Sequence, residues 1–84
     1  MPRFIDVHHD AAKGLTPEDA ARYHQMDLEV QDKYGVRFVK YWFDPVTGKT
    51  FCLSDAPNRE AVLAVHRDSH GYLADEIFEV VEGE

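Results

Sequence analysis

The spacing of hydrophobic residues changes several times along the chain and predicts six elements. Apolar and polar side chains alternate over residues 4–9, as in a half-buried strand, and residues 36–43 are dense in β-branched and aromatic side chains. Residues 16–34 and 58–70 instead carry apolar side chains at every third or fourth position, which is the period of a helix. Short apolar runs predict two further strands, at residues 50–53 and 77–81. The predicted order is therefore strand, helix, strand, strand, helix, strand.

Residues that start and stop helices support these boundaries. Thr16, which is followed by a proline, is typical of a helix N-cap, and Gly35 is typical of the residue after a helix. We expect the first helix to run to the residue before Gly35. The second helix is expected to begin after Asn58, a further N-cap residue, and to end before Gly71.

This order of elements is typical of an α+β, ferredoxin-like βαββαβ sandwich. Pro and Gly within residues 44–49 predict a hairpin between the second and third strands. In this topology the third and fourth strands flank the first, antiparallel to it, and both helices cover one face of the four-stranded sheet. We expect residues 1–84 to form a single domain, because a chain of this length has room for one small core.

The first strand sorts its side chains onto two faces of the predicted sheet. Successive residues alternate, so one face carries Phe4, Asp6 and His8 and the other carries Ile5, Val7 and His9. We expect the face with the two aliphatic residues to pack in the core. The uncovered face of the sheet would then combine the first set with Phe38, Lys40 and Trp42. Because this combination is too apolar to face water, we expect a second subunit to cover it, giving a homodimeric α+β barrel.

The composition limits the classes of function. The 84 residues are 44% hydrophobic and 30% charged, which is typical of a soluble globular protein. A formal net charge of −7, without a basic stripe, argues against a nucleic-acid partner. The lone Cys52 excludes a disulfide within the chain and predicts a reducing compartment. No apolar run approaches the length of a membrane span, so we expect a cytoplasmic protein with no membrane partner.

The histidines are expected to gather at one end of the domain. The first strand brings His8 and His9 to this end, and the second helix brings His66 and His70, four residues apart on one side of the helix. Asp27 falls near the middle of the apolar face of the first helix, where a carboxylate needs a partner. Imidazoles and carboxylates are ligands of divalent transition metals, so we predict a metal site from these five residues.

Other polar residues near this end have less specific interpretations. Asp10 and Glu76 are expected toward the same end, whereas His24 is more typical of a histidine on a helix surface. Cys52 is more typical of a small buried residue than of a ligand. Asp27 could also orient a ligating imidazole, or bond to a buried tyrosine or amide, rather than bind an ion itself.

Four segments carry a resemblance to a known family: residues 4–9, 27–43, 51–57 and 62–71, with Phe-Ile-Asp-Val-His-His in the first and Ala-Val-His-Arg-Asp-Ser-His-Gly in the last. Over nearly its whole length the chain resembles a family of small bacterial proteins, whose better-described actinobacterial members are named nickel-binding proteins. The resemblance implies a ferredoxin-like subunit, a homodimer and Ni(II) as the bound ion. The affinity order of divalent metals leaves Zn(II) and Cu(II) open as well.

We therefore predict a non-catalytic metal-binding protein that serves nickel sequestration or homeostasis. One alternative is a small dimeric α+β-barrel enzyme acting on a small organic molecule, with a pocket on the open sheet face lined by Asp6, His8, Lys40 and Trp42. Asp6 or His8 would be its general base, although no acid–base pair is recognisable in the sequence. Another alternative is an interaction module whose histidines only face solvent, but the expected convergence of five histidines argues against it.

Overall fold

The computed structural model describes residues 1–9 and 14–83 and confirms the predicted order of elements. These are strand β1 (Arg3–His8), helix α1 (Pro17–Val30), a 3₁₀ helix η1 (Gln31–Tyr34), strand β2 (Arg37–Phe43), strand β3 (Thr50–Asp55), helix α2 (Arg59–Ser69) and strand β4 (Glu76–Val80). The fold is α+β, as predicted. Asp10, which we expected near the metal site, lies outside the described residues.

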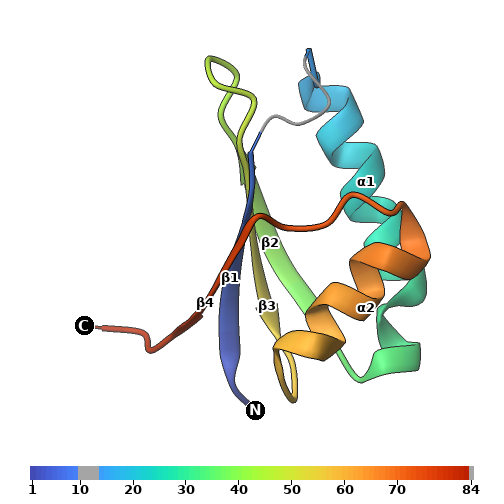
Figure 1. The fold of residues 1–84 in the computed structure, drawn as a ribbon, viewed down its shortest axis with the longest axis vertical. Coiled ribbons are helices and arrows are strands. Elements are labelled where there is room, and N and C mark those ends of the chain that lie inside the picture. Colours follow the sequence, from blue (N-terminus) through green and yellow to red (C-terminus); the bar gives the residue numbers. More distant parts are fainter. Residues whose placement is uncertain (10–13, 84) are drawn as a thin grey trace.

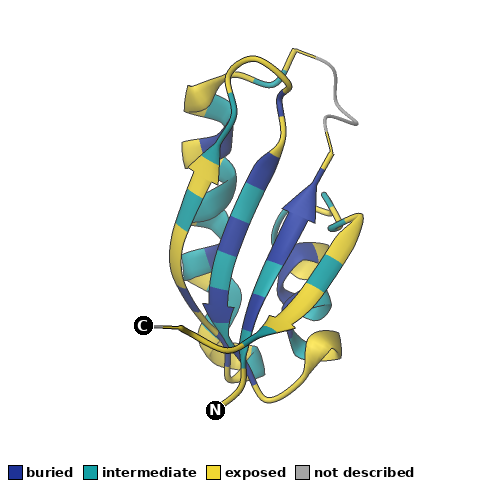
Figure 2. Ribbon diagram, turned by 90° about the vertical axis from the view of Figure 1, so that its left-hand side faces the viewer, coloured by how far each residue is buried: buried dark blue, intermediate teal, exposed yellow. Residues whose placement is uncertain are grey.

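The four strands form one antiparallel sheet in the order β2-β3-β1-β4, so β3 and β4 flank β1 as the topology predicted. Both helices lie on the same side of this sheet, and the other side is left without a covering element among the described residues (Figure 1). The two inner strands, β1 and β3, carry most of the buried positions, and the two edge strands are mainly exposed (Figure 2). Side chains of β1 that point toward the helices therefore lie at the centre of the molecule.

Local interactions explain where the helices begin and end. Thr16 Oγ1 accepts a hydrogen bond from the Asp19 amide, and the Asp19 carboxylate accepts one from the Thr16 amide, each at 3.1 Å, so the start of α1 is a capping box. α1 tightens into η1 before the chain reverses at Gly35, whose φ of 69° is left-handed. At the start of α2, Asn58 Oδ1 accepts a hydrogen bond of 2.9 Å from the Ala61 amide.

The apolar core fills one part of the space between the sheet and the helices. It consists of seven buried side chains: Phe4, Val36, Phe38, Cys52, Ala56, Val62 and Val65. Phe4 stands near the start of β1, so this core lies toward the end of the sheet where β1 begins. Toward the end of β1, several polar and ionisable side chains are buried between the layers, among them Asp6, His8, Asp27 and His66.

The expected assignment of the β1 faces was wrong. Phe4, Asp6 and His8 point toward the helices and are 2%, 0% and 2% exposed, whereas Ile5 and Val7 lie on the open face. The register shows the same division, because Asp6 is paired with the buried Cys52 and Ile5 with the half-exposed Phe78 of β4. Alternation alone could not distinguish the faces, because each one carries both apolar and polar residues.

The face assignment of β2 was also partly wrong, because the strand contains an irregularity. Its pairing with β3 shifts between Phe38 and Lys40, so the alternation of side chains is interrupted there. Phe38 consequently faces the helices, while Lys40 and Trp42 face the open side, paired with Leu53 and Phe51. The pocket expected for the enzyme alternative is not formed, since its proposed lining residues lie on opposite faces of the sheet.

Candidate metal centre

Three elements place one ionisable side chain each at the centre of the interlayer space. β1 contributes Asp6, α1 contributes Asp27 and α2 contributes His66, and all three are at most 2% exposed. His66 is held there because it lies one helical turn after the buried Val62, on the same side of α2. The burial of three such groups is stable only if they satisfy one another.

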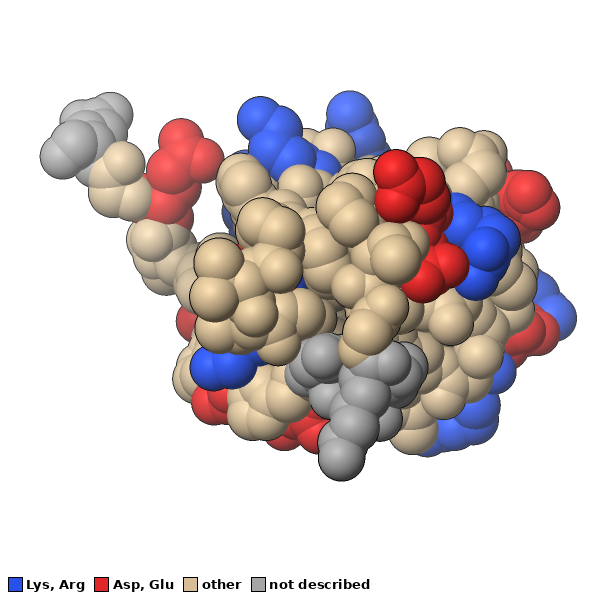
Figure 3. Space-filling view, turned by 90° about the horizontal axis from the view of Figure 1, so that it is seen from above, with Lys and Arg blue, Asp and Glu red and all other residues tan. Residues whose placement is uncertain are grey.

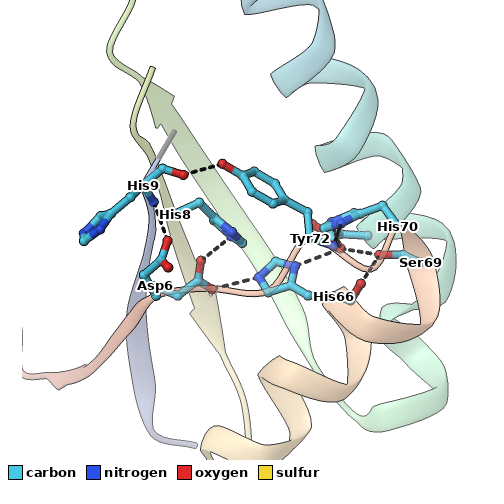
Figure 4. Close-up of polar contacts among 9 residues, drawn as sticks. Asp6, His8, His9, His66, Ser69, His70 and Tyr72 are labelled. Atoms are coloured by element: carbon cyan, nitrogen blue, oxygen red, sulfur yellow. Dashed lines mark hydrogen bonds and ion pairs between the residues drawn. The ribbon is translucent and has the colours of Figure 1, made fainter. Parts of the chain in front are cut away.

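The His66 imidazole bridges the two carboxylates (Figure 4). Its Nδ1 lies 3.1 Å from Oδ1 of Asp27 and its Nε2 lies 3.0 Å from Oδ2 of Asp6. An ionised carboxylate oxygen can only accept a hydrogen bond, so both ring nitrogens of His66 carry a hydrogen and the ring is an imidazolium. The result is a buried Asp–His–Asp unit that links the sheet to both helices.

The pKa values of this unit follow from the same contacts. Burial on its own would lower the pKa of His66, but the hydrogen bonds and negative charges of Asp27 and Asp6 outweigh it and raise the pKa to about 9. Burial on its own would raise the pKa of each carboxyl group. Hydrogen bonds from His66 and from the neighbouring imidazoles instead lower the pKa of both Asp6 and Asp27. The two carboxylates thus share the imidazolium of His66.

Two further histidines lie against the ends of this unit. His8 Nε2 is 3.0 Å from Oδ1 of Asp6, and His70 Nε2 is 3.0 Å from Oδ1 of Asp27. The Nδ1 atom of His70 accepts a hydrogen bond of 2.9 Å from the Tyr72 amide. Asp27 Oδ1 also accepts a hydrogen bond of 2.7 Å from the Ser69 hydroxyl. Four of the five predicted ligands are therefore brought together here. His66 and His70 contact Asp27, which is itself one of the four, and His8 and His66 contact Asp6.

The donor atoms of this cluster are close enough to one another to bind an ion. In one group the ligand atoms of Asp6, His8, Cys52 and His66 all lie within 4.8 Å of one another, and in another group those of Asp27, His66 and His70 do so. The imidazole and carboxylate donors fit a divalent transition metal. Burial, and then the charges of Asp6 and Asp27, raise the pKa of the Cys52 thiol well above its usual value, so the sulfur is protonated and weakly donating.

A cavity adjoins the cluster beneath α1. All of its lining residues except Ala20 are polar or ionisable: His8, Tyr23, His24, Asp27, Thr50, Cys52, His70 and Tyr72. The space inside it is about 20 Å³, which is enough for one water-sized occupant. His24, which we expected on the helix surface, is half-buried at this cavity, and desolvation lowers its pKa. Its ring lies 4.6 Å, centroid to centroid, from that of Tyr41 on β2.

His9, the remaining predicted ligand, lies apart from the cluster. Its ring points away from His8 and His66 and is about half exposed, with Nε2 2.8 Å from Oε2 of Glu76 (Figure 4). Its backbone amide donates a hydrogen bond of 2.7 Å to the Asp75 carboxylate. This arrangement follows from strand alternation, which sends His8 inward and His9 to the other face.

Seen from one end, the exterior gives little sign of the interior charge. In the view onto the end of the domain shown in Figure 3, Lys and Arg side chains form separate groups near Asp and Glu, around a broad uncharged area. Asp6 and Asp27 are 0% and 2% exposed. Sequence reasoning missed Asp6 as a partner of His66. Alternation placed Asp6 on one face with Phe4 and His8, but it did not indicate that the helices cover this face.

Comparisons with known proteins find both a family match and a structural match for this chain. Residues 4–80 match a family model described as "Nickel responsive protein SCO4226-like". The structure is similar to the crystal structure of SCO4226 from Streptomyces coelicolor A3(2), with a TM-score of 0.88 and 40% sequence identity over 98% of this chain and 99% of that one. No curated protein matches. Among the described residues, neither helix combines the length and apolar character that a membrane crossing requires. The chain belongs to the SCO4226-like family of nickel responsive proteins.

Proposed function

We propose that this protein binds divalent nickel in the buried cluster and serves nickel sequestration or homeostasis rather than catalysis. The observation that carries the proposal is the convergence of Asp6, His8, Asp27, His66 and His70 between the sheet and the helices, with ligand atoms within 4.8 Å in each of two groups. The family description, which refers to a nickel response, supports the choice of metal. His9 is not part of the proposed centre, because its exposed ring pairs with Glu76 instead.

The chemistry of the donors fits nickel and leaves two competitors. Imidazole nitrogen suits nickel, zinc and copper alike, and carboxylate oxygen is a harder donor that these ions also accept. To ligate a divalent ion, His66 would have to lose a ring proton, and the ion would supply positive charge near the carboxylates in its place. Binding should therefore release protons and weaken as the pH falls through the range in which imidazoles protonate.

We also propose that the protein is a cytoplasmic homodimer whose subunits pair through the open sheet face. This face carries two half-exposed aromatic side chains, Trp42 at 49% and Phe78 at 48%. Ile5, Leu53 and Val80 line a hollow of about 210 Å³, to which Arg3 and Glu82 also contribute. Large exposed apolar side chains on one face of a sheet are typical of a face that pairs with an equivalent face.

The test of nickel binding is isothermal titration of tag-free, chelator-treated protein with Ni(II), Zn(II) and Cu(II). We expect micromolar or tighter nickel binding at pH 7 that is lost near pH 5. Repeating the titration in two buffers of different ionisation enthalpy measures the protons released. A folded His66→Ala/His70→Ala double variant is expected to bind at least about 10-fold more weakly, since loss of orienting partners alone has this effect. The absence of heat with every metal at pH 7 would refute the proposal.

A further inference from the structure

Two groups of donor atoms share the imidazole ring of His66. The group at Nε2, on the side of the sheet, has three other members: Asp6, His8 and Cys52. The group at Nδ1, on the side of the helices, has two other members: Asp27 and His70. The hydrogen bonds within each group show which of the two is free to accept an ion.

The donors on the helix side are already committed to one another. Oδ1 of Asp27 accepts hydrogen bonds from the Ser69 hydroxyl at 2.7 Å and from His66 Nδ1 at 3.1 Å. Nδ1 of His70 accepts a hydrogen bond from the Tyr72 amide, which can only donate, so Nε2 of His70 carries the ring hydrogen. His70 could bind an ion through Nε2 only if this hydrogen moved to Nδ1 and the bond from the amide were broken.

The donors on the sheet side are less committed. Asp6 is 0% exposed, and among the described residues its Oδ1 has no aligned hydrogen-bond partner, although His8 Nε2 lies 3.0 Å away. Nδ1 of His8 is buried and also lacks a partner in the described part of the chain. No hydrogen bond therefore fixes the ring proton of His8, and its Nε2 is free to present a lone pair. A buried carboxylate oxygen such as Oδ1 of Asp6 is expected to have a donor or a cation as its partner.

The spacing of the atoms on the sheet side suits a single ion. The ligand atoms of Asp6, His8, Cys52 and His66 all lie within 4.8 Å of one another. Two atoms that bind the same ion at about 2.1 Å are themselves about 3–4 Å apart. The contacts of the Asp6 carboxylate with Nε2 of His8 and with Nε2 of His66 are both 3.0 Å. Figure 4 shows these three side chains directed toward one another from β1 and α2.

Cys52 completes the group from the neighbouring strand. It is paired with Asp6 in the β1–β3 register and is 5% exposed, so both side chains stand on the helix-facing side of the sheet. The thiol is protonated when no metal is bound, but a thiol that coordinates a cation is deprotonated outright. Its thiolate and the Asp6 carboxylate would supply the two negative charges that balance a divalent ion.

His66 is oriented for binding through Nε2. When a histidine binds a metal through one ring nitrogen, the other usually donates its hydrogen to a carboxylate. Nδ1 of His66 has this contact with Asp27, and Asp27 is held in turn by Ser69 and His70. The arrangement on the helix side is therefore that of positioning residues behind a ligand.

We infer that the metal ion is bound on the sheet side of His66, by the carboxylate of Asp6, Nε2 of His8, Sγ of Cys52 and Nε2 of His66. This inference rests on the proposed function, because it names the atoms by which the proposed ion is held. The Nε2 hydrogen of His66 and the thiol hydrogen of Cys52 leave as protons when the ion binds. Imidazole, carboxylate and thiolate are all ligands of divalent transition metals.

The first experiment is X-ray absorption at the nickel edge of the nickel-loaded wild-type protein. Cys52 is the only cysteine of the chain, so a thiolate ligand can come from no other residue. We expect one thiolate and two imidazole ligands, together with the near-ultraviolet charge-transfer absorption of a nickel thiolate. Both thiolate signals should be absent in Cys52→Ala.

Affinity then separates the ligands from the positioning residues. Cys52→Ala should weaken nickel binding by more than the roughly 10- to 100-fold that loss of an orienting partner causes. His70→Gln should stay within that range and keep the thiolate signals. His9→Ala is the control and should leave binding unchanged, because the His9 ring is about half exposed and pairs with Glu76.

Different outcomes separate this inference from the proposed function. If the wild type binds nickel without a thiolate ligand, the inference is wrong while the protein is still a nickel binder. A larger loss in His70→Gln than in Cys52→Ala, or a loss in His9→Ala, would also overturn it, since the ion would then lie on the helix side or at the surface. If the wild type binds no nickel, both proposals fail. Circular dichroism establishes that each metal-free variant is folded, and the spectra of the wild type decide the question even if a variant is not.

Discussion

Each of the two faces of the sheet departs in part from the usual distribution of side chains. The helix-covered face has Asp6 and His8 at its centre, both at most 2% exposed, whereas the open face presents Trp42 and Phe78, each about half exposed. Burial of charge is unfavourable and exposure of large apolar groups is uncommon, so each face carries a cost in an isolated subunit. We interpret the covered face as the site of ion chemistry and the open face as the site of subunit pairing.

The largest expected effect comes from removing one charge of the buried unit. Asp6→Ala leaves the His66 imidazolium with one carboxylate partner and His8 with none at Nε2. We expect the free energy of unfolding of the metal-free protein to fall by about 3–5 kcal/mol, as measured by urea denaturation. Asp68→Ala, which removes an exposed carboxylate that pairs with Lys33, is the control and should have little effect. Equal stabilities of the two variants would contradict the role given to Asp6.

The second largest effect is expected in the dependence of the free energy of unfolding on pH, which reports on the ionisable groups of the covered face. The pKa of His66 is about 9 in the folded protein and about 6.5 in an unfolded chain. Its stabilising contribution is therefore complete below about pH 6.5 and is lost as the pH rises through 9, a change of about 3 kcal/mol. Asp6 and Asp27, with lowered pKa values, act in the opposite direction and stabilise the fold above about pH 4.

This dependence can be measured by urea denaturation of chelator-treated protein between pH 4 and 10. We expect a plateau from about pH 4 to 6.5 and then a decline. A His66→Gln variant should show a lower stability without the decline above pH 6.5. A wild-type protein that becomes more stable between pH 7 and 9 would show that His66 is not an imidazolium in the folded state.

A substitution on the open face is expected to change the stability less, but to change the mass of the particle in solution clearly. Trp42→Glu places a carboxylate in the proposed subunit interface and should convert the dimer into a monomer of 9.7 kDa in light scattering. Val46→Glu is the matched control, because Val46 is 91% exposed and lies in the hairpin between β2 and β3. A wild-type protein that is already monomeric at high concentration would remove the proposed role of this face.

The smallest effect is expected at His9. Its contact with Glu76 joins two side chains that are each nearly half exposed, so His9→Ala should change the free energy of unfolding by at most a few tenths of a kcal/mol. His8→Ala, one residue earlier in β1, should be several-fold more destabilising in the same urea assay. Similar effects of the two substitutions would mean that the alternation of β1 has no energetic consequence.

The elements and their order could be predicted from the sequence because their signals are local. Thr16 and Asn58 cap the helices where expected, and Asp27 was recognised as a carboxylate on an apolar helix face. The orientation of the sheet could not be predicted in the same way. β1 alternates equally well in either orientation, and the irregularity after Phe38 reverses the alternation of β2 without any Gly or Pro to indicate it.

The composition of the site was predictable only in part for a related reason. His66 and His70 share one side of α2 by helical geometry, and chain direction placed His8 near them. The role of Asp6 depends on which face of the sheet the helices cover, and the position of His24 over the cavity depends on how α1 packs against Tyr41. Both facts belong to the tertiary structure and leave no periodic signal in the chain.

The two hydrogen bonds of His66 affect how the protein behaves when no metal ion is bound. A small metal-dependent domain such as a zinc finger unfolds when its ion is removed, because its ligands then repel one another or lose their only partners. In this chain the imidazolium serves as a built-in counter-ion for Asp6 and Asp27 whenever no metal is present. We therefore expect the metal-free protein to remain folded, so that under the proposed function uptake and release of an ion would leave the chain intact.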